Sequence, residues 1–106
     1  MHLDAARQGA WVEFDGVGPD SIVPHVQLVL ALRNEGLLGR VLISHDAGWY
    51  QVGEPGGGKF RSFETLFTQF LPALLTAGLS AAEVQQLIRN NPREAFAVRV
   101  RKLSRF

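Results

Sequence analysis

Hydrophobic positions along the chain alternate between short runs typical of strands and longer runs typical of helices. Ala10–Asp15 is rich in aromatic and β-branched residues and ends at Gly16, which predicts a strand. Apolar residues dominate from Ile22 to Glu35, where Gly36 follows, and this predicts a helix. Residues 41–46 predict a short, buried parallel strand.

A glycine-containing loop at 47–61 separates the second strand from another helix. Ser62 is expected to cap this helix, and Pro72 is expected to kink it because proline removes a backbone donor. Its apolar residues recur at helical spacing and form one continuous face, made of Phe63, Leu66, Phe67, Phe70, Leu71, Leu74 and Leu75.

A third helix is expected after the capping-box pair Ser80 and Glu83, ending before Asn91-Pro92. A short helical turn around Ala95-Phe96 should follow it. Residues 3–8 resemble the last turns of a further helix, which suggests that a segment upstream is missing.

The predicted order is therefore β-α-β-α-α, an α/β fold in one domain spanning 1–106 without an internal boundary. Helical crossovers imply that the two strands are parallel. Two parallel strands leave both sheet edges unpaired, and the apolar faces lack a partner within the chain. We therefore expect self-association, or pairing with a polypeptide that supplies the missing strands.

The composition of the chain excludes several kinds of site and partner. The 106 residues include no cysteine, which excludes disulfides, thiolate metal sites and cysteine nucleophiles. The net charge of +1 gives no general attraction to nucleic acid or to a membrane surface, and no apolar run is long enough to cross a bilayer. The basic residues at 99–105 suit a solvated terminus better than a nucleic-acid contact. A soluble cytoplasmic protein is the default expectation.

Both predicted strands end in an acid, with glycine next in Asp15-Gly16 and one residue later in Asp46-Ala47-Gly48, and α/β folds place their chemistry at such strand ends. From the residues alone, Asp46 is either a metal ligand or a loop carboxylate. Asp15 either lines a pocket mouth or binds backbone donors in its turn. His45 is adjacent to Asp46, but successive strand residues face opposite sides, so a structural role is expected for it.

The segment Gly53–Lys59 almost matches the phosphate-binding pattern G-x-x-x-x-G-K-[ST]. Phe60 stands where the magnesium-binding hydroxyl should be, and six residues separate the glycines from the strand. A mobile loop over the site is therefore favoured over nucleotide binding, with Trp49 and Tyr50 offering apolar surface to a substrate.

Several segments together resemble the phosphotriesterase-related family of the amidohydrolase superfamily. Arg40–Trp49, Arg-Val-Leu-Ile-Ser-His-Asp-Ala-Gly-Trp, resembles the family's eighth strand and the loop after it. Gly9–Asp15 resembles the seventh strand. The likeness continues through the two helices at 22–35 and 63–77 to a closing segment at 87–96, and so covers nearly the whole chain.

This resemblance implies the C-terminal two βα units, strands 7 and 8 with their helices, of a TIM (β/α)8 barrel that binds two divalent metals, usually zinc. Asp46 matches the eighth-strand aspartate, which ligates a metal and accepts a proton during hydrolysis of an ester, lactone or phosphotriester. Asp15, Trp49 and Tyr50 would lie near the substrate.

The family's other metal ligands come from strands that this chain does not contain, and the three histidines, His2, His25 and His45, do not match them. Gly16 stands where several members carry His or Arg. The chain alone is expected to be inactive. The alternative is a non-catalytic, self-associating assembly module derived from a piece of the barrel.

Overall fold

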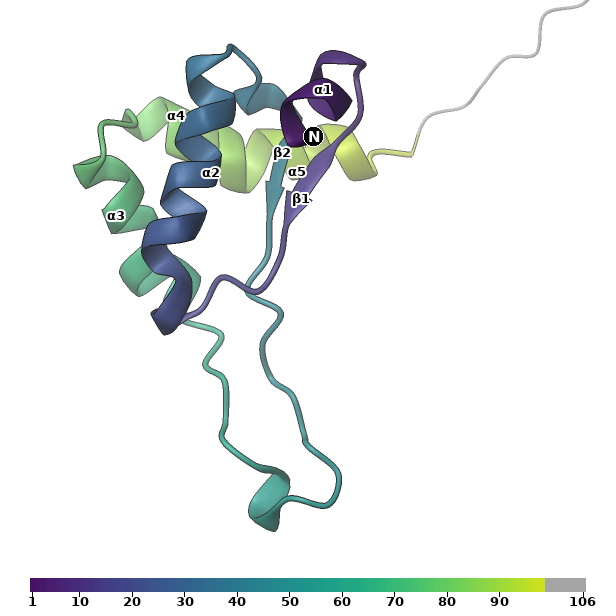
Figure 1. Cartoon of the computed structure of the whole chain (residues 1–106), viewed down its shortest axis with the longest axis vertical. Helices are drawn as coiled ribbons and strands as arrows, with labels where there is room; N and C mark the ends of the chain where they lie inside the picture. Colours follow the sequence, from purple (N-terminus) through teal and green to yellow (C-terminus); the bar gives the residue numbers. More distant parts are fainter. Residues whose placement is uncertain (99–106) are drawn as a thin grey trace, which may run out of the picture.

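The computed structural model describes residues 1–98 and shows two parallel strands among short helices (Figure 1). The α-helices and strands are α1 (His2–Arg7), β1 (Val12–Phe14), α2 (Ile22–Asn34), β2 (Val41–Ile43), α3 (Leu71–Thr76), α4 (Ala81–Gln85) and α5 (Asn91–Phe96). The 3₁₀ turns are η1 (Pro19–Ser21), η2 (Leu38–Arg40) and η3 (Pro55–Gly57), and two π-helical turns are η4 (Leu66–Phe70) and η5 (Gln86–Asn90). The basic residues at 99–105 lie outside the described residues.

The predicted parallel pairing of the strands is confirmed. Val12 pairs with Val41 and Phe14 with Ile43. Val12 and Phe14 are buried and Glu13 is exposed, as the strand alternation predicts. Each strand spans only three residues, fewer than expected.

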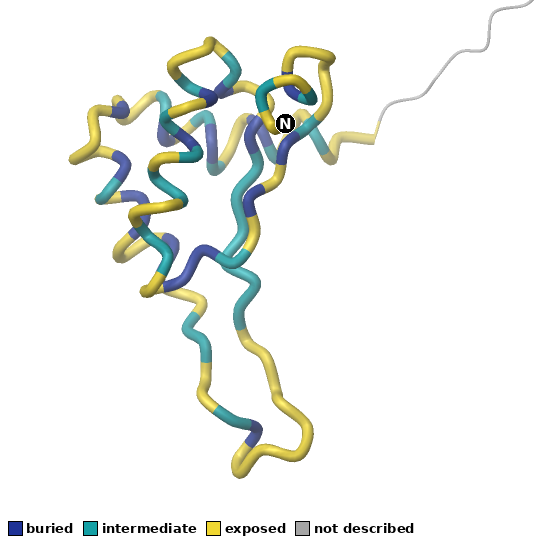
Figure 2. The backbone as a smooth tube through the Cα atoms, viewed as in Figure 1, coloured by how far each residue is buried: buried dark blue, intermediate teal, exposed yellow. Residues whose placement is uncertain are grey.

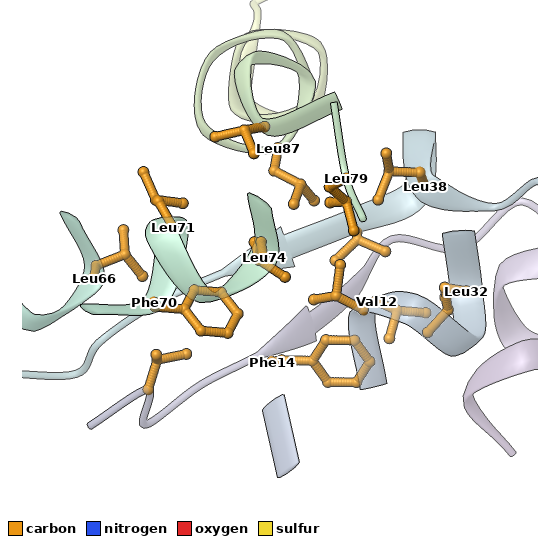
Figure 3. Close-up of a cluster of buried hydrophobic side chains, with 14 of the residues drawn as sticks. Val12, Phe14, Leu32, Leu38, Leu66, Phe70, Leu71, Leu74, Leu79 and Leu87 are labelled. Carbon is orange, nitrogen blue, oxygen red and sulfur yellow. The ribbon is translucent and has the colours of Figure 1, made fainter. Parts of the chain in front are cut away.

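The core lies between the sheet and the helices that follow each strand. Val12 and Phe14 pack with buried residues of α2 and of the η4–α3 segment (Figure 3). Phe70 and Leu74 are completely inaccessible to solvent. Burial of this apolar surface is the main favourable contribution to folding.

The apolar face formed by residues 63–75 is only partly covered. Leu66, Phe70, Leu71 and Leu74 are buried, but Phe63, Phe67 and Leu75 are about half exposed and contribute apolar surface outside the core. Among the described residues, the elements packed on this helix are too few to cover so broad a face.

The expectation that a helix ends before Asn91-Pro92 was wrong. The helical path passes through η5 into α5, just as η4 passes into α3 at Pro72. Proline lacks the backbone donor and its ring clashes with the carbonyl four residues earlier. In both places a wider π-helical turn stands directly before the proline-containing segment, so the chain continues without ending.

The β2 strand was expected to be fully buried, but only Val41 is, whereas Leu42 and Ile43 are partly accessible (Figure 2). Leu42 pairs with the exposed Glu13, so this face of the sheet is incompletely covered by the described residues. Each strand also has a single strand neighbour in the described part of the chain. Among residues 1–98, no helix is long and apolar enough to cross a membrane.

An ion pair joins α2 to the first turn of α4. Arg33 Nε donates to Glu83 Oε2 over 2.8 Å and Arg33 Nη2 donates to Oε1 over 3.1 Å. Glu83 also accepts a hydrogen bond from the Ser80 amide, as the capping box predicts. The hydrogen bond from Arg33, followed by that from Ser80, lowers the pKa of Glu83 from 4.5 to about 2.

Replacing Glu83 with glutamine is expected to lower the melting temperature by a few degrees at neutral pH, because the charge-assisted pair with Arg33 is lost, whereas glutamine can still complete the capping box. The folded-state pKa is depressed, so the contribution is complete above pH 4.5 and is lost as the pH falls toward 2. Melting followed by circular dichroism from pH 7 to pH 2 should show the melting temperatures of wild type and E83Q converging as the pH falls. The exposed Glu64 provides the control E64Q, and a constant difference at all pH values for E83Q would contradict the assignment.

Candidate functional site at the carboxyl ends of the strands

The loops that follow β1 and β2 are joined by backbone hydrogen bonds. The Ser44 amide donates to the Phe14 carbonyl over 3.0 Å, and the Val17 amide donates to the Ser44 carbonyl over the same distance. The parallel pairing thus continues one step beyond the strands and brings the segments bearing Asp15 and Asp46 together. This is the edge of a parallel sheet where functional side chains collect.

Asp46 has a left-handed backbone conformation, with φ of 49°. Its amide donates to Ser44 Oγ over 3.2 Å. Its carbonyl accepts hydrogen bonds from Trp49 Nε1 over 2.8 Å and from Arg61 Nη1 over 3.4 Å. Its carboxylate makes no hydrogen bond or ion pair within residues 1–98, so the backbone is held while the acid stays available.

Asp15 is exposed, and its Oδ1 accepts a hydrogen bond from the next residue, the Gly16 amide, over 2.8 Å. Its carbonyl lies 2.9 Å from His25 Nε2, while His25 Nδ1 lies 2.8 Å from the Ser21 carbonyl. His25 therefore links the loop after β1 to the start of α2.

His45 packs edge-to-face on Phe63, with ring centroids 5.6 Å apart. Its Nδ1 is buried without a hydrogen-bond partner in the described part of the chain. The contact with Phe63 lies at the start of the following helical segment, in agreement with the structural role expected for His45.

A cavity of about 620 Å³ opens beside these loops. Its wall consists of Gly16, Gly18, Pro19, Asp20, Ser21, Trp49, Gln51, Lys59, Phe60, Arg61, Ser62 and Thr65. Of the residues singled out from the sequence, Trp49 lines the cavity, whereas Asp15, Asp46 and Tyr50 are not part of its wall. Aromatic, hydroxyl and cationic groups on one wall suit a small, partly apolar molecule with polar substituents.

Tyr50 is largely exposed and packs on the loop rather than on the cavity. A Cβ at Gly57 would lie 2.3 Å from Tyr50 Cδ2, so glycine is needed where the ring crosses the backbone. The Gln51 amide donates to the Gly57 carbonyl over 2.7 Å and closes the loop on itself. The η3 turn, Pro55–Gly57, lies at the tip of this loop, away from α2 and α3 (Figure 1), whereas a phosphate-binding loop leads directly from a strand into a helix.

Arg61 is the residue that sequence reasoning missed. It comes from the far end of the long loop, and its Nη2 donates to the Gly16 carbonyl over 3.0 Å. A single arginine after a glycine-rich loop carries no sequence signal for such a contact, because its partners lie 45 and 15 positions away.

The metal expected from the resemblance can be tested against the donors present. Within residues 1–98, no three His, Asp or Glu side chains are grouped so that they could hold an ion. Zinc takes three or four protein ligands. The described residues, Asp46 included, therefore do not form such a site by themselves.

Comparison with known proteins agrees with the resemblance. The model of the Phosphotriesterase family matches residues 2–96. The phosphotriesterase homology protein of Escherichia coli (strain K12) is 36% identical over 91 residues, a stretch that covers 83% of this chain and 30% of that protein.

Two crystal structures resemble the fold. A resiniferatoxin-binding protein from Rhodobacter sphaeroides matches with a TM-score of 0.69 and 31% identity, over 89% of this chain and 29% of the other. The Escherichia coli phosphotriesterase homology protein, complexed with phosphate in its active site, matches with a TM-score of 0.65 and 33% identity, over 87% of this chain and 33% of the other. The chain thus spans about a third of these relatives' length. It belongs to the phosphotriesterase family.

Proposed function

We propose that this chain supplies strands 7 and 8, with their helices, to a (β/α)8 barrel that hydrolyses an ester, lactone or phosphotriester. The observation that carries the proposal is the position of Asp46. Its carboxylate has no hydrogen-bond or ion-pair partner among residues 1–98 and stands at the carboxyl end of a parallel strand, in a chain that matches the family from 2 to 96. A free acid at this edge is useful to a metal site and of little use to folding.

The roles of the chain's own residues follow from their positions. Asp46 would hold one divalent metal, preferably zinc, and accept a proton from the reacting water. Trp49 would form an apolar wall against the substrate, with Tyr50 on the adjoining loop and Asp15 at the neighbouring strand end. When bound, the two cations of the family would supply an activated water and polarise the scissile group.

The other metal ligands must come from further strands, which the sheet has room to accept. Both strands have a free outer edge among the described residues, and the face bearing Glu13 and Leu42 is incompletely covered. Parallel sheets are normally several strands wide and covered on both faces. The same surfaces favour the second candidate function, a self-associating module without catalysis.

A chimera tests the catalytic proposal. Residues 2–96 would replace the matching segment of the Escherichia coli relative, and bound metal would be measured by elemental analysis alongside hydrolysis of a panel of lactones and phosphotriesters. We expect the chimera to keep its parent's metal content, and Asp46→Asn to lower it by about one equivalent and the hydrolysis rate by at least about 100-fold.

Glu64, an exposed carboxylate outside the cavity wall, provides the control E64Q, which should keep both metal and activity. Unchanged metal content in D46N would contradict the ligand role of Asp46. A metal-free homo-oligomer of the isolated chain, together with a D46N chimera indistinguishable from its parent, would instead establish the assembly module.

A further inference from the structure

We propose that Arg61 is a positioning residue that fixes the backbone at Asp46 by joining the loops after the two strands. Its Nη2 donates to the Gly16 carbonyl over 3.0 Å, and its Nη1 reaches the Asp46 carbonyl at 3.4 Å. The effect of Arg61 on catalysis rests on the proposed function, whereas its hydrogen bonds to the two carbonyls do not.

The backbone of Asp46 needs such support because of its conformation. Among the described residues other than glycine, Asp46 alone has a positive φ. L-residues rarely adopt this region, and they persist there when surrounding contacts determine the geometry. Three contacts do so at Asp46, namely its amide to Ser44 Oγ and its carbonyl to Trp49 Nε1 and to Arg61. Since backbone rotation at Asp46 swings its side chain, these contacts set the direction of the carboxylate.

The space for the guanidinium is created by glycine. A Cβ at Gly18 would lie 2.9 Å from Arg61 Nη2, closer than a Cβ normally approaches another heavy atom. Gly18 itself is extended, with φ of −129° and ψ of 175°, a conformation open to any residue. The glycine at this position is therefore explained by room for Arg61 and not by backbone strain. A Cβ at Gly16 would lie 3.9 Å from the same nitrogen, which is an ordinary contact, so the close approach is specific to Gly18.

The hydrogen-bond partners of Arg61 show that it holds the backbone and does not neutralise a carboxylate. Both of its side-chain hydrogen bonds go to main-chain carbonyls, and within residues 1–98 it forms no ion pair. The backbone of Arg61 is held too, since its carbonyl accepts a hydrogen bond from the Gly48 amide over 3.1 Å. Arg61 thus holds the segment around Asp46 without occupying its carboxylate.

The two tryptophans of the chain allow a direct test by NMR on the full chain labelled with ¹⁵N and ¹³C. The Trp49 indole N–H donates to the Asp46 carbonyl, so its exchange with water reports whether that hydrogen bond is kept. Trp11, which lies beside Arg40, is the internal control. In Arg61→Met and in Gly18→Ala, we expect the Trp49 indole proton to exchange with water about tenfold faster, the effect of losing roughly one hydrogen bond. The ¹³C shifts of Asp46 should also move away from left-handed values, while the Trp11 indole stays unchanged.

Gly18→Ala displaces the guanidinium while leaving Arg61 in place, so the test stands even if R61M folds poorly. Arg61→Lys, which keeps one cationic donor, should fall between wild type and R61M. Lys59→Met removes a neighbouring cation from the same cavity wall and should have no effect. Unchanged Asp46 shifts and Trp49 exchange in both R61M and G18A would overturn the proposal. None of these readouts requires metal or activity, so they separate a failure of this proposal from a failure of the proposed function.

Discussion

Replacing Phe70 with alanine is expected to lower the free energy of unfolding by roughly 3–5 kcal/mol, the usual cost of removing a buried aromatic side chain. Phe70 is completely inaccessible to solvent and lies in η4 next to Leu66, Leu71 and Leu74 (Figure 3). It also packs edge-to-face on His25, with ring centroids 6.4 Å apart. Alanine would leave a cavity at the point where the η4–α3 segment meets α2, because the surrounding helices cannot collapse fully into it.

Urea denaturation at a fixed protein concentration measures the change, since self-association would otherwise alter the apparent stability. Phe67 lies in the same π-helical turn but is 58% exposed, so Phe67→Ala is the matched control and should cost less than about 1 kcal/mol. Equal losses for F70A and F67A would show that the core is not centred on Phe70.

Replacing Asn91 with alanine is expected to cost roughly 2–4 kcal/mol, because two buried carbonyls would lose their donor. Asn91 is 3% exposed, and its Nδ2 donates to the Leu38 carbonyl over 2.7 Å and to the Val41 carbonyl over 2.8 Å. The side chain thereby attaches the beginning of α5 to the beginning of β2.

Asn91→Asp removes the hydrogen-bond donor but keeps the side-chain volume, so it separates the two contributions to the loss of stability. Aspartate has the same shape, but its ionised carboxylate can only accept, so it would face two carbonyls without a proton to share. At neutral pH, N91D should therefore be at least as destabilising as N91A in the same urea assay. The exposed neighbour Asn90 gives the control N90A, which should change stability by less than about 0.5 kcal/mol. A nearly neutral N91D would contradict the hydrogen bonds assigned to Asn91.

In the candidate site, the residue that presents the carboxylate is held in place by neighbouring residues. Asp46 presents a carboxylate that has no partner among residues 1–98, while Ser44, Trp49 and Arg61 hold its backbone. A catalytic group must be held within a narrow range of positions to be effective. The contacts that restrain Asp46 involve none of the carboxylate oxygens, which leaves both available for chemistry.

Local features of the structure were predictable because each depends on residues within about one helical turn. The capping box at Ser80 and Glu83 forms as its spacing indicates, with the Glu83 amide donating to Ser80 Oγ over 3.1 Å. Gly9 and Gly36 follow α1 and α2 with positive φ, as expected of residues that end helices. The alternation in β1 separates Val12 and Phe14 from Glu13, and the structure buries the first two and exposes the third.

By itself, the sequence determined the β-α-β-α-α order, the parallel strands, the strand faces and the family, because these depend on short-range patterns and on the similarity of whole segments. Only the tertiary structure decided which apolar side chains of 63–75 are covered, and that the helical path continues through Pro92. It also decided which distant groups meet, as Arg61 meets Gly16 and Asn91 meets Val41. Such contacts depend on the packing of elements 45 to 50 positions apart, to which neighbouring residues in the sequence give no clue.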